Sequence, residues 1–257
     1  MKSKVEMWQI VVIFLFAWIY AATGQAADDQ LKLGVSMYDR TTGTYLNEQL
    51  EAGDHVRTPF RKFRIFNYLT NPEIDRAMSI PSHYIASDYL QSLKSAGIDI
   101  VAYDIEPGLK NITDEELSDP VGAVRTMSTF CEQNDFRLIV GPSRKILKRH
   151  GAEMAQYADA IGIMSGKSQE RSAVDFKADM LELINIVKYG NSDVQIYIQL
   201  RTFHKSRSST QDDYFSATEL MRFVNEVRDH ADGISLIYTR DTIPIMEEFI
   251  YKFKLNR

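Results

Sequence analysis

The sequence contains a single cysteine, Cys131, among its 257 residues. One cysteine cannot form a disulfide within the chain, so the fold must be held together by its hydrophobic core. With 44% hydrophobic and 25% charged residues, the composition is that of ordinary globular material. The chain is long enough to bury one sizeable core.

Several sequence motifs that indicate a particular function are absent. No glycine-rich phosphate fingerprint follows an apolar run, and there is no Gly-x-Ser-x-Gly elbow of the kind that carries a nucleophilic serine. The histidines, His55, His83, His150, His204 and His230, fall at no metal-ligand spacing. We therefore expect no metal and no cofactor, and nucleophilic acyl chemistry is disfavoured.

An excess of positive charge is also missing, because the formal net charge is −5 at pH 7. Binding to nucleic-acid phosphates requires a net basic face. We therefore expect no nucleic-acid partner.

The N-terminal segment differs from the rest of the chain. Lys2 and Lys4 precede an apolar run over residues 8–22, and small residues follow up to Ala26. This layout predicts a secretory signal peptide over residues 1–26, cleaved after Ala26, and the alternative is an uncleaved membrane anchor. In both cases residues 27–257 form one domain outside the cytoplasm, secreted or extracytoplasmic, and contact with a membrane is limited to the N-terminal segment.

Short apolar, β-branched runs alternate with amphipathic stretches along residues 27–257. Most of the runs are apolar on both faces, which is typical of parallel strands covered by helices on both sides. The runs that predict strands are residues 32–38, 63–69, 98–104, 136–141, 160–164, 194–200 and 233–238.

The amphipathic stretches between these runs have helix signals. Asp119 before Pro120 is typical of an N-cap followed by a first-turn proline, and Ser216 with Glu219 forms a capping-box pattern. Apolar stripes at helical spacing follow both starts, and Cys131 lies on the first of them, where a packed core thiol is expected.

Seven predicted strands separated by helices indicate an α/β fold, a (β/α)8 TIM-type barrel in which one strand is degraded or unrecognised. An open doubly wound sheet is the alternative. It has less support, because the chain lacks the phosphate fingerprint of its dinucleotide-binding form.

The most informative stretch is residues 97–108, where an apolar run ends in Asp104, Ile105 and Glu106 before Pro107 and Gly108. Side chains two apart on a strand point to the same side, so the two carboxylates should project together from the strand's carboxyl end. Active sites of α/β barrels lie at this end. Paired carboxylates suit glycoside cleavage, in which one group donates a proton while the other stays charged. The alternative is a structural ion pair with Arg201 or Arg240.

Polar residues at or just after the other strand ends predict the rest of the mouth of the barrel. The substrate-binding candidates are Asp39, Asn67, Gln199, Arg201 and Arg240, beside Ser143, Arg144, Ser165 and Tyr238. Asp39 and Asp241 could supply a further carboxylate, and aspartate at a turn is the simpler reading of both.

The segment Asp99-Ile100-Val101-Ala102-Tyr103-Asp104-Ile105-Glu106 resembles the D-x-x-D-x-D-x-E strand motif of the family 18 chitinase-like glycoside hydrolases. The resemblance implies a glycosidase barrel in which Glu106 is the general acid and Asp104 orients the N-acetyl group of the substrate. It also makes Tyr238 a candidate for the tyrosine that contacts the same group. Ala102 departs from the motif, which has an aspartate there.

Three functions follow from these observations. The first is an exported glycoside-hydrolase-like protein that acts on or binds a carbohydrate, with Glu106 as acid/base and Asp104 assisting. The second is a noncatalytic glycan-binding barrel, suggested by Ala102. The third is a site for an anionic or phosphoester ligand, built from Arg144, Arg201, Lys205 and Arg240.

Overall fold

The computed structural model describes residues 30–257 except 38–40, 61, 85–88 and 205–213. Eight strands pair in chain order, each parallel to the next, and β8 pairs with β1 to close a barrel. The strands are β1 (Lys32–Ser36), β2 (His55–Thr58), β3 (Asp75–Ser79), β4 (Ile100–Ile105), β5 (Arg137–Pro142), β6 (Ala160–Met164), β7 (Gln195–Arg201) and β8 (Gly233–Ile237). The fold is a (β/α)8 barrel, as the sequence predicted.

All eight strands are present, so none is degraded, and two of them were not recognised in the sequence. The strand predicted over residues 63–69 was wrong, because this segment is the 3-10 helix η1 (Phe63–Tyr68). The true second and third strands, β2 and β3, are short and carry His55, Arg57, Asp75 and Arg76. Charged side chains at these positions interrupt the apolar pattern by which a strand is recognised.

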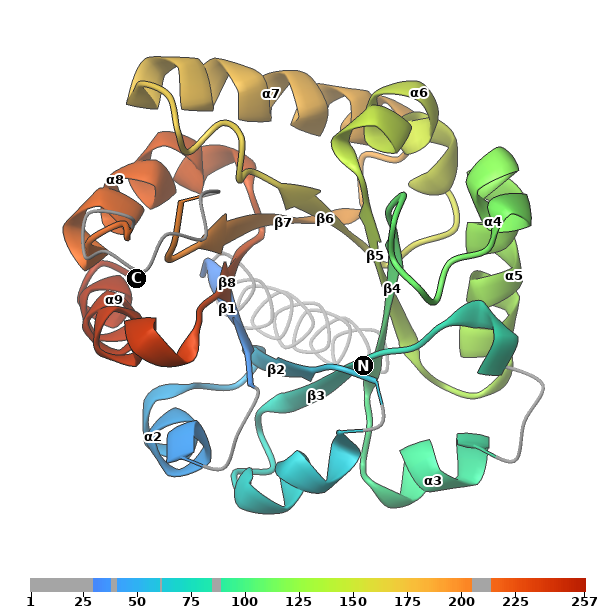
Figure 1. Ribbon diagram of the computed structural model, residues 1–257, viewed down its shortest axis with the longest axis horizontal. Helices are drawn as coiled ribbons and strands as arrows, with labels where there is room; N and C mark the ends of the chain where they lie inside the picture. The colour runs from blue at the N-terminus through green and yellow to red at the C-terminus, as the bar shows by residue number, and fades with distance from the viewer. Residues whose placement is uncertain (1–29, 38–40, 61, 85–88, 205–213) are drawn as a thin grey trace, which may run out of the picture. The chain divides into compact units, whose positions relative to one another are not determined.

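The helices form a ring around the barrel (Figure 1). They are α2 (Thr41–Gln49), α3 (Tyr89–Ser95), α4 (Asp114–Ser118), α5 (Pro120–Gln133), α6 (Arg144–Met154), α7 (Ala173–Gly190), α8 (Ala217–Val227) and α9 (Ile243–Leu255), with further 3-10 turns η2 (Ser82–Tyr84), η4 (Arg228–His230) and η5 (Arg240–Thr242). The helix starts were predicted correctly: Asp119 caps α5 and Ser216 forms a capping box with Glu219 at α8. Among the described residues, no helix has the length and hydropathy needed to cross a membrane.

The main hydrophobic core lies between the barrel and the helices. Val101, Tyr103 and Ile105 of β4 are all fully buried, and Val124 and Met127 of α5 are fully buried as well. Cys131 is buried on the same helix, and burial raises the pKa of its thiol to about 12. It is therefore a packed core thiol.

The inside of the barrel is more polar than the shell around it. His55 of β2 and Tyr197 of β7 meet there edge to face, with ring centroids 5.1 Å apart. Glycines make the room for both rings, since a β-carbon at Gly34 would overlap the imidazole and one at Gly233 would overlap the phenol ring. Burial holds the pKa of His55 down to about 3, so the imidazole is neutral.

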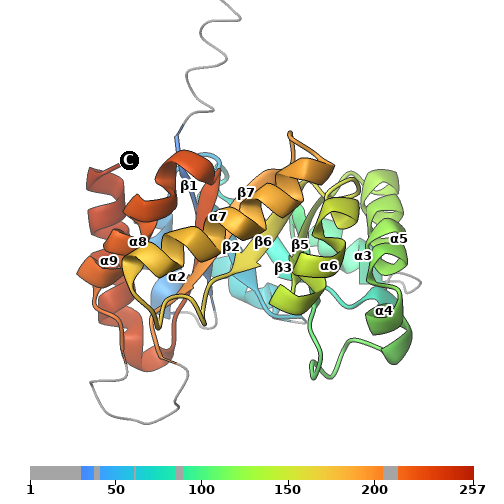
Figure 2. The ribbon, with the colours of Figure 1, turned by 90° about the horizontal axis from the view of Figure 1, so that it is seen from above.

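The two ends of the barrel differ in character. Figure 2 shows α4 at the end where the strands finish, and the C-terminal end of α9 at the other. At the α9 end, the Arg257 guanidinium forms a buried ion pair with Asp54, which also accepts a hydrogen bond from the Leu33 amide at 2.7 Å. These contacts tie the last residue of the chain to the start of the barrel, and the α4 end carries the cavity described next.

Candidate active site

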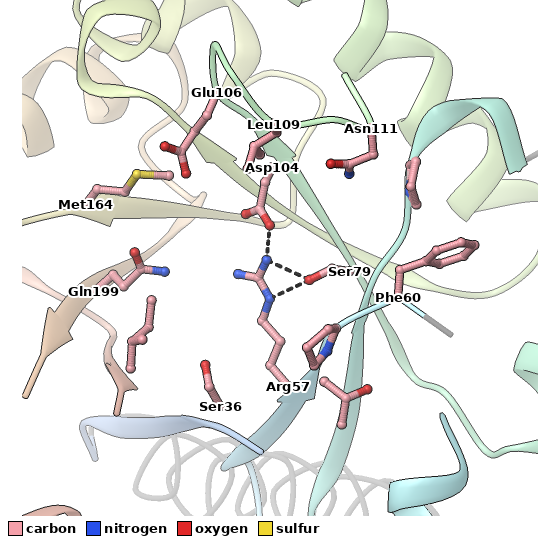
Figure 3. A pocket seen from close by; sticks show the side chains of 14 residues that line it. Ser36, Arg57, Phe60, Ser79, Asp104, Glu106, Leu109, Asn111, Met164 and Gln199 are labelled. Carbon is pink, nitrogen blue, oxygen red and sulfur yellow. Dashed lines mark hydrogen bonds and ion pairs between the residues drawn. The ribbon is translucent and has the colours of Figure 1, made fainter. Parts of the chain in front are cut away.

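A cavity of about 410 Å3 opens at the carboxyl ends of the strands. Its wall combines polar side chains with apolar ones, which is typical of pockets that orient a small ligand. The lining residues are Ser36, Arg57, Thr58, Pro59, Phe60, Ser79, Pro81, Asp104, Glu106, Leu109, Asn111, Met164, Gln199 and Ile237 (Figure 3).

An arginine from β2 reaches across β3 to the aspartate of β4. The Arg57 guanidinium forms an ion pair with Asp104 through Nη2, and it donates from Nη2 and Nε to the Ser79 hydroxyl at 2.8 and 3.0 Å (Figure 3). Both side chains of the pair are largely buried, at 18% and 21% exposure. A charged pair held by a third group has a fixed geometry, so Asp104 is a positioned anion at the cavity floor.

Glu106 directly follows the last residue of β4 and faces the same cavity (Figure 3). Its carboxyl group makes no hydrogen bond or ion pair with any other described residue. Partial burial raises its pKa, the negative charge of Asp104 raises it further, and Arg57 opposes the shift. The site therefore holds one anchored carboxylate beside one unanchored carboxyl group that retains its proton more readily.

The loop that follows Glu106 is anchored from behind the sheet. Tyr103, which points outward from β4, donates a hydrogen bond to Glu116 of α4. Glu116 also accepts from the Thr113 amide at 2.7 Å and so completes the capping box of α4. The loop between these anchors supplies Leu109 and Asn111 to the cavity wall.

A smaller chamber of about 20 Å3 lies deeper in the barrel and shares Arg57 and Gln199 with the main cavity. Small side chains line much of it, including Ala77, Ala102 and Gly162. Ala102 occupies the position at which the chitinase-like motif has its middle aspartate. In this protein the position lines a chamber that Arg57 also lines.

The cavity brings together three of the residues that the sequence predicted for the site, Asp104, Glu106 and Gln199. Asp39 lies outside the described residues. The alternative prediction was a structural ion pair between one of the two carboxylates and Arg201 or Arg240. Asp104 does form an ion pair, but its partner is Arg57.

The other predicted site residues lie outside the cavity lining. Tyr238, which directly follows β8, is buried and donates to the hydroxyl group of Thr42 in α2 at 3.0 Å. Asn67 is exposed on η1, since the segment predicted as a strand is a 3-10 helix. Arg201 pairs with Glu170 and donates to the Gly166 carbonyl, whereas Arg240 is exposed on η5.

The described part of the proposed anion site is not a free cluster of cations. Arg144 forms an ion pair with Asp179 at 3.1 Å, and Arg201 is paired with Glu170. Lys205 is outside the described residues. Asp241, considered as a further carboxylate, is exposed on η5 and does not line the cavity.

Sequence reasoning missed Arg57, Ser79, Phe60 and Asn111. Arg57 and Ser79 belong to the two strands that were not recognised, and the polar, apolar, polar alternation of His55-Val56-Arg57 was the available signal. Phe60 and Asn111 lie in loops, whose path the local sequence does not define. Within the described residues, no group of three or more His, Cys, Asp or Glu side chains could hold a metal ion.

The chain matches no protein-family model and no curated protein. Its structure is similar to the catalytic domain of a family GH18 chitinase from the fern Peteris ryukyuensis, with a TM-score of 0.61 and 10% identity over 88% of this chain and 100% of the other. A family 18 chitinase from Crocus vernus gives a TM-score of 0.58 and 11% identity, covering 88% of this chain and 98% of that one.

Triosephosphate isomerase from Bartonella henselae is nearly as similar, with a TM-score of 0.57 and 11% identity over 88% of this chain and 99% of that one. A chitinase and an isomerase perform different chemistry on this architecture. The similarity therefore establishes a TIM barrel that resembles glycoside hydrolases in fold, and function has to be argued from the cavity.

Proposed function

We propose that this protein is a glycoside-hydrolase-like barrel that acts on a carbohydrate, with Glu106 as general acid/base and Asp104 assisting. The observation that carries the proposal is the pairing of an unanchored carboxyl group of raised pKa with an anchored carboxylate, side by side in one cavity. A general acid must hold its proton until the leaving oxygen takes it. The fold shared with two chitinases supports the proposal.

In the proposed reaction Glu106 protonates the glycosidic oxygen and the bond from that oxygen to the anomeric carbon breaks. The Asp104 carboxylate stabilises the positive charge that develops on the sugar. Water then adds to the anomeric carbon, and its proton returns to Glu106. Asp104 and Glu106 are the two carboxylates that line the described cavity; Asp104 belongs to β4 and Glu106 directly follows it.

The test uses Glu106→Gln, Asp104→Asn and a control, Glu115→Gln, which alters an exposed carboxylate of α4. Each is assayed for release of reducing ends from a panel of soluble glycans that includes oligomers of N-acetylglucosamine. We expect turnover by the wild type and by the control, and its loss in Glu106→Gln with folding retained. Turnover unchanged in Glu106→Gln would refute the assignment.

A noncatalytic glycan-binding barrel is the second candidate. Ala102 in place of the motif aspartate favours it, as does the engagement of Asp104 by Arg57. The discriminating result is saturable glycan binding by calorimetry with no reducing ends released by the wild type.

We also propose that the protein is exported, by way of residues 1–26. The charged start, apolar run and small-residue end support this. Expression of the full chain in a bacterial host, followed by N-terminal sequencing of the exported protein, tests it. A mature form beginning at Ala27 indicates a cleaved signal, an intact membrane-associated chain indicates an anchor, and retention of the intact chain in the cytosol contradicts export.

A further inference from the structure

The Arg57 guanidinium group has hydrogen-bond partners on one side and faces the cavity on the other. Its Nε and Nη2 atoms donate to Ser79 and Asp104, whereas Nη1 has no hydrogen-bond partner among the described residues. In Figure 3 this third nitrogen faces the open cavity on the side of Gln199. A guanidinium nitrogen carries donors and no acceptor, so whatever meets Nη1 must offer an acceptor.

The cavity wall that Nη1 faces contains no charged side chain among the described residues. Ser36, Met164, Gln199 and Ile237 form it, from β1, β6, β7 and β8. The Ser36 hydroxyl and the side-chain amide of Gln199 make no hydrogen bond with another described residue. Three groups able to donate therefore border one open space.

Charge is distributed unevenly across the cavity. Both lining carboxylates lie at the carboxyl end of β4, and the Arg57 guanidinium sits between Asp104 and the wall of Gln199 and Ser36 (Figure 3). A negative group at that wall would meet the cation before it met Asp104. The protonated form of Glu106, which partial burial favours, would not repel it.

We propose that the cavity binds an acidic sugar whose carboxylate accepts hydrogen bonds from Arg57 Nη1, the side-chain amide of Gln199 and the Ser36 hydroxyl group. The inference rests on the proposed carbohydrate function and assigns its substrate class: glycans that contain a uronic acid. A carboxylate is an acceptor-only, charged group, and its hydrogen bonds with a guanidinium are about twice as strong as those between neutral groups. A phosphate or sulfate ester would carry negative charge as well, and the test separates these cases.

The experiment measures binding of trimers of galacturonic, glucuronic and mannuronic acid to the wild type by calorimetry. Each is compared with its carboxyl-reduced neutral counterpart, with a sulfated galactose trimer and with a trimer of N-acetylglucosamine. We expect at least one uronic acid trimer to bind about tenfold more tightly than its neutral counterpart. That preference should weaken as salt is added, because ion pairing in a solvent-connected cavity is screened.

The variants assign the preference to Arg57. In Arg57→Gln the acidic and neutral trimers should bind within about twofold of each other, and Arg57→Lys, which keeps the charge but loses the fork, should retain part of the preference. The matched control is Arg240→Gln, at an exposed arginine outside the cavity lining. This variant should leave the ratio of the affinities for the acidic and neutral trimers unchanged. If Arg57→Gln does not fold, Gln199→Leu and Ser36→Ala provide the second test. Each should reduce the ratio of the affinities for the acidic and neutral trimers.

The outcomes separate this inference from the proposed function. Equal binding of acidic and neutral trimers, a preference that survives in Arg57→Gln, or tighter binding of the sulfated trimer overturns the acidic-sugar assignment. Binding and cleavage of the N-acetylglucosamine trimer alone overturns it too, and leaves the glycosidase proposal standing. If no glycan binds, both fail.

Discussion

Gly141 of β5 lies against Asp104 of β4 so closely that a β-carbon at position 141 would come within 2.5 Å of Asp104 Oδ1. The two residues are partners in the β4–β5 register. Asp104 is therefore confined on one side by the backbone of Gly141 and on another by the guanidinium of Arg57.

This confinement makes Gly141→Ala a test of the carboxylate's position. The added methyl group should push the Asp104 side chain away from its present place and weaken its pair with Arg57. We expect kcat/KM on the cleaved glycan to fall by about 100-fold, the scale associated with misplacing a reacting group by about 1 Å. The control is Gly162→Ala on β6, where the nearest atom to an added β-carbon is 3.7 Å away. Equal activity in both variants would show that the position of Asp104 does not limit turnover.

The raised pKa of Glu106 has a consequence for stability. Because the folded state holds this proton more tightly than the unfolded state, the carboxyl group destabilises the fold as pH rises through its folded pKa, and the cost is absent at low pH. We expect Glu106→Gln to unfold at a higher temperature than the wild type near neutral pH. The difference should vanish well below the ordinary pKa of 4.5. Thermal unfolding followed by circular dichroism checks this, with Glu115→Gln as the control that should show no such difference.

His55 predicts the opposite pH dependence. Its imidazole is buried and neutral, with a pKa held to about 3, whereas the unfolded chain binds a proton at the ordinary value of 6.5. Stability from this residue is therefore complete above pH 6.5 and is lost as pH falls toward 3, by up to about 1.4 kcal/mol per pH unit. In denaturant titrations, His55→Phe should flatten the acid limb relative to the wild type. His230→Phe, on η4, is the comparison, and an unchanged slope in His55→Phe would contradict the assignment.

The Tyr103–Glu116 hydrogen bond predicts a coupled loss of stability and ligand binding. Tyr103→Phe removes the donor and leaves the buried Glu116 carboxylate with one partner fewer, at a cost of about 1–3 kcal/mol. Because the loop between them supplies Leu109 and Asn111 to the cavity, glycan affinity should also fall. Urea unfolding and calorimetry measure the two effects. Tyr189→Phe, at a tyrosine that is 90% exposed, should change neither.

The barrel was predictable because most of its strands are buried on both faces. Residues 160–164 were predicted with the observed bounds of β6, and the caps at Asp119 and Ser216 marked the starts of α5 and α8. These features depend on local chemistry, namely apolar runs and side chains that cap nearby amides. The carboxylate pair could be predicted for the same reason, since the two-residue repeat of a strand places Asp104 and Glu106 on one side.

The cation of the site could not be predicted in the same way. Arg57 lies on a four-residue strand, and its partner Asp104 is 47 residues away in sequence. Tyr238 lies outside the cavity lining, and its hydroxyl group donates to Thr42 of α2, which is 196 residues away in sequence. Both outcomes depend on which elements the closed barrel brings together, and that information is not contained in any short stretch of sequence.

The reach of Arg57 from β2 across β3 to β4 joins three neighbouring strands through a single side chain. Two of these strands have only four and five residues and so contribute few ladder bonds of their own. A ligand that strengthens the contacts of Arg57 with Ser79 and Asp104 would therefore reduce the motion of β2, β3 and β4 more than that of the later strands. Slowed amide exchange in β2 and β3 would then be a signature of occupancy that needs no chemical turnover to be seen.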